Sequence, residues 1–135
     1  MAFQYRDEAE AFYEQLAPRL RQFNLEVAAE KTSLKRFSRF HPHPQNYFEF
    51  LGFRFYWDKD YNGEPRLRRR TAPKKHKAAL KEFGQWIKSN RHKRMEQLMP
   101  ELKRKVAGFR NYFGLPDNSG SLWRIYSYIL NSLHI

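Results

Sequence analysis

Residues Tyr47–Trp57 read YFEFLGFRFYW, and this stretch decides the fold class. Its aromatic residues favour a β-strand. Two phenylalanines precede Gly52 and two follow it, and the two pairs fall on opposite parities of the strand alternation. A glycine at such a point indicates a bulge or a close backbone approach. We therefore predict one aromatic strand over this stretch, with a bulge or a close backbone approach at Gly52.

The segment that follows predicts a hairpin. Residues Asp58–Pro65 (DKDYNGEP) are polar and contain the turn dipeptide Asn62-Gly63, and Arg66–Thr71 supplies the return strand. The pattern D-x-D-x-N-G opens many calcium-binding loops, but Arg69 stands where such a loop needs a bidentate glutamate. The segment is therefore interpreted as a polar turn.

Upstream, apolar residues at helical spacing predict a helix over residues 7–23. Asp7 and Glu10 suit a capping box, and Pro18 predicts a kink or a break. Short strands are expected at residues 25–27 and 33–37.

The segment that leads into the aromatic stretch is expected to be a loop. Residues 41–46 carry alternate prolines, which do not fit a paired strand. The pair His41 and His43 is interpreted as part of this loop, because two histidines without a third ligand indicate zinc only weakly.

Downstream, three helical segments are expected. Residues 73–89 start with Pro73 in the first turn, which suits a helix start. Residues 92–113 carry a long apolar stripe that Pro100 is expected to divide, and residues 119–134 carry the third stripe. The predicted class is α+β: a helix, short antiparallel strands and a β-hairpin, followed by an all-α three-helix part.

The amino-acid composition and the net charge limit the kinds of site and partner that this chain can have. The 135 residues carry a formal net charge of +12 and no cysteine, so disulfide scaffolds, thiol nucleophiles and thiolate metal sites are excluded. The start lacks the pattern of a signal peptide, and no apolar run approaches the length of a membrane helix. We expect a cytoplasmic or organellar protein that is not secreted. Its expected partner is a polyanion, and nucleic acid is the first candidate.

The charge is concentrated in the middle of the chain. Residues 1–30 carry a net charge of −3, whereas residues 71–113 carry +9. Such a distribution predicts one electropositive surface rather than a general solubilising charge. The cations expected to contact RNA phosphates are Arg66, Arg68, Arg69, Arg70, Lys74, Lys75, Lys77, Lys81, Arg91, Lys93, Arg94, Lys103, Arg104, Lys105 and Arg110.

Among these cations, the arginines of the return strand stand out. On a strand, Arg66, Arg68 and Arg70 point to one side, and a row of three cations favours an anion lying across it. Aromatic residues interleave with the cations and can stack on unpaired bases. For Trp86 and Phe109 a place in the core is the favoured interpretation.

Signatures of enzyme chemistry are missing from the sequence. It contains no G-x-S-x-G, no P-loop and no G-x-G-x-x-G. Its carboxylate pairs lie on a helix among surface-like neighbours, and none forms the inward-facing set that a two-metal site needs. Binding is therefore favoured over catalysis.

Three segments, in order, resemble one family. Leu25–Thr32 (LEVAAEKT), Phe48–Phe55 (FEFLGFRF) and Gly108–Phe113 (GFRNYF) resemble segments of group II intron reverse transcriptases, also called maturases. The resemblance implies that residues 1–71 are the end of a polymerase palm and that residues 72–135 are the thumb, or domain X. It also implies that Lys31 lies near the nucleotide phosphates.

The same resemblance matches Phe50, Leu51 and Gly52 to the primer-grip hairpin, which holds the primer 3′ end, and places Arg54 at the border of the primer site. The expected partners are group II intron RNA and template–primer nucleic acid. Two further partners are considered. One is the missing fingers–palm part, and the other is a second copy of the chain that pairs through an open palm edge. A membrane surface is not expected, because the apolar stripes of the helices look core-facing.

The departures from the family limit the expected activity. The Tyr-x-Asp-Asp box would lie just upstream of Phe3, and Phe109 stands where the family often has Trp. We therefore expect an RNA-binding fragment that is not catalytic alone; Mg²⁺ belongs to the parent polymerase, and no cofactor is expected here. In the alternative interpretation the chain is one half of a split RNA-directed DNA polymerase, active when paired with a fingers–palm chain.

Overall fold

The structure is a computed structural model of the whole chain and describes residues 1–40 and 45–133. The predicted loop over residues 41–46 lies mostly outside the described residues, as do His41 and His43. The chain forms two compact units, Met1–Phe37 and Ser38–Ile135. The boundary expected between residues 71 and 72 follows the resemblance and stays a prediction; the sheet and the last three helices share the second unit.

The first unit consists of α1 (Arg6–Arg21) and the short 3-10 helix η1 (Ala29–Lys31). The predicted helix is present, and α1 continues through Pro18 without a break. Although its apolar residues recur at helical spacing, α1 buries none of its side chains in the described structure.

Two details of this unit differ from the prediction. Asp7 does not cap the helix: the N-cap position is Tyr5, with no side-chain hydrogen bond, and Glu10 accepts a hydrogen bond from Arg6 Nε at 2.6 Å. Residues 25–27 and 33–37 form no strand. Strand alternation over so few residues is insufficient, because a strand also needs the hydrogen bonds of a neighbour.

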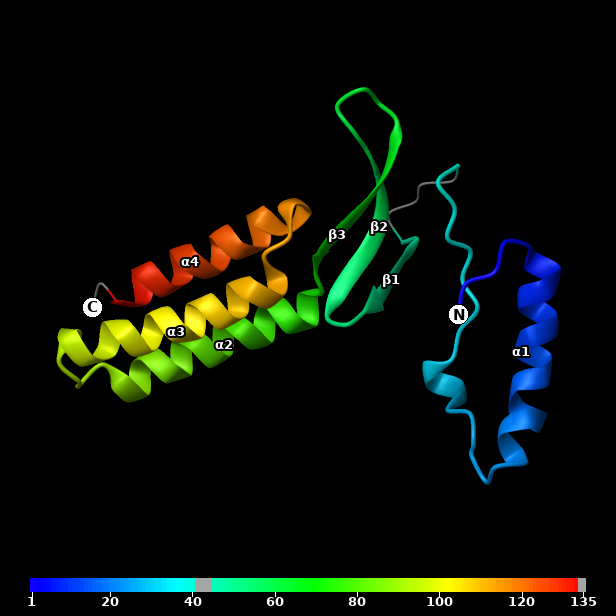
Figure 1. Cartoon of the computed structure of the whole chain (residues 1–135), viewed down its shortest axis with the longest axis horizontal. Coiled ribbons are helices and arrows are strands. Elements are labelled where there is room, and N and C mark those ends of the chain that lie inside the picture. The colour runs from blue at the N-terminus through cyan, green and yellow to red at the C-terminus, as the bar shows by residue number, and fades with distance from the viewer. Residues whose placement is uncertain (41–44, 134–135) are drawn as a thin grey trace. The chain divides into compact units, whose positions relative to one another are not determined.

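The second unit begins with a three-stranded antiparallel sheet in the order β1 (Tyr47–Phe50), β2 (Phe53–Lys59) and β3 (Pro65–Thr71) (Figure 1). The prediction of one strand over residues 47–57 is wrong, because the stretch forms two strands with Gly52 in the turn between them. Leu51 and Gly52 have φ angles of 51° and 81°, which is the pattern of a two-residue type I′ turn, and the chain reverses there.

The reversal gathers the four phenylalanines of the stretch on one face of the sheet, the aromatic face. Phe50 lies opposite Phe53, and Phe48 lies opposite Phe55 with the two rings stacked at 4.9 Å. The change of parity at Gly52 is therefore the signature of a turn rather than of a bulge. The other face carries Arg54 and Glu49 beside the paired Tyr47 and Tyr56.

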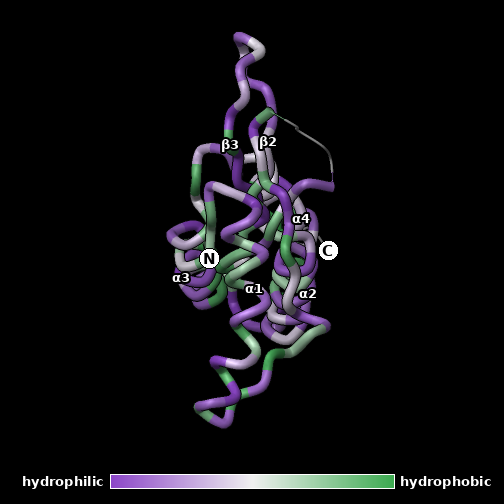
Figure 2. Tube along the Cα trace, turned by 90° about the vertical axis from the view of Figure 1, so that its right-hand side faces the viewer, coloured by the Kyte–Doolittle hydropathy of each residue, from purple (hydrophilic) through white to green (hydrophobic). Residues whose placement is uncertain are grey.

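The hairpin predicted between β2 and β3 is confirmed. Asp60 Oδ1 accepts hydrogen bonds from the backbone N–H groups of Asn62 and Glu64, at 2.8 and 2.9 Å, and Gly63 has a φ of 82°. Figure 2 shows this loop largely in the colour of hydrophilic residues. The loop is a rigid polar turn, as its sequence indicates.

Three helices follow: α2 (Pro73–Asn90), α3 (Met95–Phe113) and α4 (Ser119–Leu133), with the 3-10 helix η2 (Pro116–Asn118) before α4. Pro73 starts α2 as predicted. Pro100 lies inside α3 and does not divide it, because Leu98 and Leu102 on either side are buried in the core. No helix among the described residues is long and apolar enough to cross a membrane.

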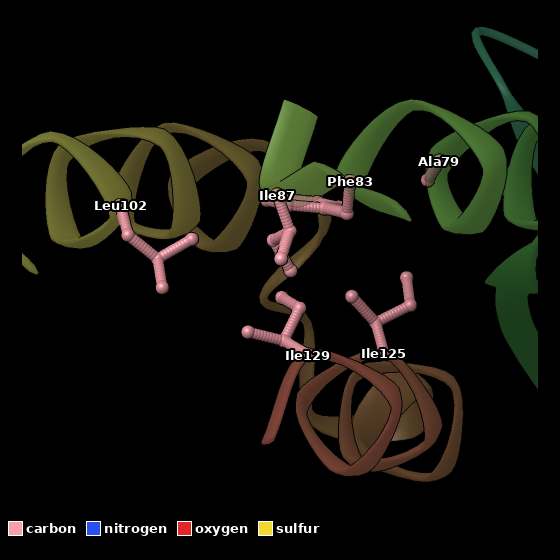
Figure 3. Close-up of a cluster of buried hydrophobic side chains, with 6 residues drawn as sticks. All are labelled: Ala79, Phe83, Ile87, Leu102, Ile125 and Ile129. Carbon is pink, nitrogen blue, oxygen red and sulfur yellow. The ribbon is translucent and has the colours of Figure 1, made fainter. Parts of the chain in front are cut away.

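The core of this unit lies between the three helices. Figure 3 shows Ile125 and Ile129 of α4 directed toward Phe83 and Ile87 of α2, and Leu102 contributes from α3. Trp86 and Phe109 are partly buried against this cluster, which confirms their predicted place in the core.

Aromatic contacts join the sheet to the helices. Phe53, which is 9% exposed, contacts Phe113 with ring centroids 5.2 Å apart. Phe113 stacks on Phe109 at 4.6 Å, and Phe109 meets Phe83 edge-on at 5.9 Å. This continuous row fixes the β1–β2 turn relative to α2 and α3.

Candidate nucleic-acid interface

Helices α2 and α3 concentrate the positive charge of the chain. Together with the short link between them they carry twelve cations and three carboxylates. Two of the carboxylates are engaged: Glu101 pairs with Lys93 at 3.0 Å and Glu82 with Lys105 at 2.5 Å. The predicted contact residues that are exposed here are Lys74, Lys75, Lys77, Lys81, Arg91, Arg94, Lys103, Arg104 and Arg110. The segment therefore presents a surplus of cations to solvent.

Part of this charge lines an open groove between α2 and α3, next to the β1–β2 turn. The groove has a volume of about 750 Å³, and its wall includes Leu51 and Gly52 of the turn. Lys75, Arg104 and Lys105 supply its cations. Five residues predicted for the site from different parts of the sequence thus meet in one place.

Tyr112 holds the turn at this groove. Its hydroxyl donates a hydrogen bond to the carbonyl oxygen of Leu51 at 2.8 Å, and its ring stacks on Phe53 at 5.9 Å. Gly52 faces α3: a Cβ added to it would lie in ordinary van der Waals contact with the ring of Phe113, at 3.6 Å. The segments FLGF and GFRNYF, about sixty residues apart in the sequence, therefore lie against each other.

The arginines of β3 have internal partners. Arg66 lies 3.5 Å from the carboxylate of Asp117, and Arg68 lies 3.5 Å from that of Asp58. Arg70 lies over the ring of Tyr56, 5.0 Å from its centroid. The three share one face as predicted, but these partners relieve the mutual repulsion that favoured a phosphate there.

The remaining predicted residues lie elsewhere. Arg69 is on the opposite face of β3, across from Phe55. Arg54 pairs with Glu49 at 2.7 Å and covers the ring of Tyr47 at 3.8 Å. Phe50 is exposed on the aromatic face, and Lys31 is exposed in η1 of the first unit.

Sequence reasoning missed two features of the groove. Glu82 places one carboxylate among the cations, and the bond between Tyr112 and Leu51 fixes the turn. The sequence does indicate the place of Glu82: it follows Lys75 by seven residues, which is two turns of helix, so the two side chains share one face of the helix. Nothing in the sequence indicates the second, because it joins residues distant along the chain.

Other chemistry finds no support in the described part of the chain. No three His, Asp or Glu side chains come together there in a way that could hold a metal ion. Burial lowers the pKa of His76 below its ordinary value, and the charge of Arg124 acts in the same direction. What the site offers is cations, exposed aromatic rings and a rigid turn.

No family model, no curated protein and no solved structure matches this chain.

Proposed function

We propose that this chain is an RNA-binding palm–thumb module of the group II intron reverse transcriptase/maturase type, which holds structured intron RNA and template–primer without being catalytic alone. One observation carries the proposal most: the hydrogen bond from Tyr112 to Leu51 brings two of the segments that resemble this family together at the mouth of a cationic groove. Phosphates would lie along Lys75 and Arg104, and the turn at Leu51-Gly52 would border the primer end.

The experiment is a salt series of RNA binding by the purified chain. The ligands are a structured group II intron RNA and an unrelated RNA of equal length. Cations that contact phosphates release counterions, so the logarithm of the affinity falls linearly with that of the salt concentration, by about 0.7 to 0.9 per contact. A steep slope with a preference for the intron RNA supports the proposal, and absence of binding to both RNAs refutes it.

A double charge reversal sharpens this test. Lys75→Glu with Arg104→Glu removes two groove cations that are exposed to solvent, and we expect the slope to fall by roughly 1.4 to 1.8 for both RNAs. Arg19→Glu with Arg21→Glu makes the same change in charge on α1 and serves as the control. Equal slopes for the two double variants would remove the groove from the contact surface.

One observation favours the alternative of a split polymerase. Strand β1 is an edge strand of the three-stranded sheet, and the edge of a sheet is where a further palm strand would add. Under this alternative, adding a separate fingers–palm chain restores Mg²⁺-dependent primer extension. Extension by the mixture, with none by either chain alone, would decide for it.

A further inference from the structure

Helix α3 has a second groove on its other side, against α4. This groove has a volume of about 540 Å³. The buried Leu102 and Ile129 form its floor, together with the half-buried Met99, Val106 and Leu133. It is lined by different residues of α3 from those that face the cationic groove with α2.

The walls of this groove leave large apolar side chains in solvent. Trp123 is 69% exposed and Leu130 is 56% exposed. With Tyr126 and Leu133 they form one row on α4 at steps of three, four and three residues, which is the spacing that packs against another helix. The opposite wall on α3 spans residues 99–111, a length of about 18 Å or three helical turns.

The charges at this groove have one sign. Lys103 and Arg110 lie in its lining, and no carboxylate does among the described residues. Both cations were expected to contact RNA, and they line a different groove from Lys75 and Arg104. Two copies meeting through this face would bring like charges together, which disfavours a symmetric pairing.

We propose that the α3–α4 groove is a docking site for an amphipathic helix of a partner protein, one whose apolar row is flanked by acidic residues. The apolar row would lie on Val106, Leu130 and Trp123, and the acidic flanks would pair with Lys103 and Arg110. Helix-in-groove recognition of this kind needs an apolar channel and a matching charge at its edges. The proposal does not depend on the RNA-binding function.

Two labelled peptides test the proposal on the full chain by fluorescence anisotropy. Each has about 21 residues with leucine at heptad positions a and d, and carries glutamate or lysine at positions e and g. We expect the acidic peptide to bind at least about tenfold more tightly than the basic one. Equal binding of the two peptides, or none, overturns the proposal.

A matched pair of variants locates the binding. Leu130→Glu adds a negative charge inside the groove, whereas Asn131→Glu adds it at the exposed neighbouring position, which does not line the groove. We expect the first to weaken binding of the acidic peptide by about tenfold or more and the second by less than about threefold. Equal effects would mean that the peptide binds elsewhere.

Two further outcomes would assign the groove to another occupant. If Leu130→Glu lowers RNA affinity by about tenfold while Asn131→Glu does not, the groove is part of the RNA surface. If the chain self-associates in sedimentation and Leu130→Glu alone abolishes this, the occupant is a second copy. Either result overturns the proposed partner, and neither depends on whether the salt series favours intron RNA.

Discussion

Asn118 joins the end of β3 to the end of α3. Asn118 is 1% exposed, and its side chain makes three hydrogen bonds. Oδ1 accepts one from Thr71 N at 2.8 Å. Nδ2 donates the other two, to Thr71 Oγ1 at 2.7 Å and to the carbonyl oxygen of Phe113 at 2.8 Å. A buried amide that is fully satisfied in this way specifies one arrangement of the two elements.

We expect Asn118→Ala to lower the free energy of unfolding by about 2 kcal/mol, because the N–H of Thr71 would be left buried without a partner, whereas the carbonyl of Phe113 keeps its hydrogen bond from the N–H of Leu115. Urea denaturation followed by circular dichroism measures the change. Asn131→Ala, at an exposed position, is the control. A loss as small as that of the control would mean that water replaces the amide.

His76 makes stability depend on pH. Burial, aided by Arg124, lowers the pKa of His76 in the folded chain below its ordinary value of 6.5. The unfolded chain therefore binds a proton at a higher pH than the folded chain does. At pH values above the ordinary pKa, His76 is neutral in both states and its titration costs the folded chain no stability. As the pH drops below that pKa, the unfolded chain takes up the proton first, and the free energy of unfolding falls.

We expect His76→Gln to flatten the decline in the free energy of unfolding between pH 7.5 and pH 5.5, because glutamine does not titrate in this range. Urea denaturation of both proteins at several pH values measures it. The offset at high pH reports the structural cost of the substitution, and the slope reports the titration. Parallel curves would show that His76 is not the source of the pH dependence.

At the level of elements, the β1–β2 turn is built from an unfavourable residue. Leu51 has a φ of 51°, a conformation that costs a non-glycine residue about 1 to 2 kcal/mol, and its side chain is 65% exposed. Burial of the side chain therefore does not offset the strain. Strain that local packing does not explain points to a functional role for the side chain.

We expect Leu51→Asn to raise the free energy of unfolding by roughly 0.5 to 1 kcal/mol, because asparagine tolerates the left-handed conformation and Asn-Gly is the favoured type I′ pair. Leu51→Ala is the matched control, since it removes the same exposed side chain and keeps the strain. Equal changes in the two variants would show that the exposed leucine, rather than its φ angle, sets the stability.

The elements also show which parts of the fold are readable from sequence. Helices α2, α3 and α4 follow their apolar stripes, because burying one face of each determines how they pack. Short strands are not readable in this way: residues 25–27 alternate but do not pair. The residue pattern does not indicate the reversal at Leu51, because the turn uses leucine where a sequence signal would need asparagine or aspartate. Only the family resemblance implied a hairpin there.

The sequence also predicts only part of the candidate site. Charge counting located the basic face on α2 and α3, since a surplus of cations on a helix has to reach solvent. It did not predict that Asp117, fifty-one residues away, would pair with Arg66, or that Arg68 would meet Asp58. Such pairings depend on tertiary contacts, which residue counts do not contain.

For the whole molecule, the two units differ completely in charge. Residues 1–37 hold six cations and six carboxylates and carry no net charge, so residues 38–135, with twenty cations and eight carboxylates, carry the entire +12. Among the residues that the structure describes, the buried hydrophobic ones all belong to the second unit as well. Both the core and the field that would attract a polyanion therefore lie in one unit.

This division predicts how a truncated chain behaves. We expect a fragment of residues 38–135 to fold cooperatively, because it keeps every residue of the helical core and the hydrogen bonds of Asn118. Its RNA affinity should show the same salt slope as the full chain, within about one unit, because no net charge is removed. Circular dichroism melting is measured first, and the salt series follows on the folded fragment. A folded fragment whose slope is lower by two or more would place phosphate contacts in residues 1–37, where Lys31 is the first cation to substitute.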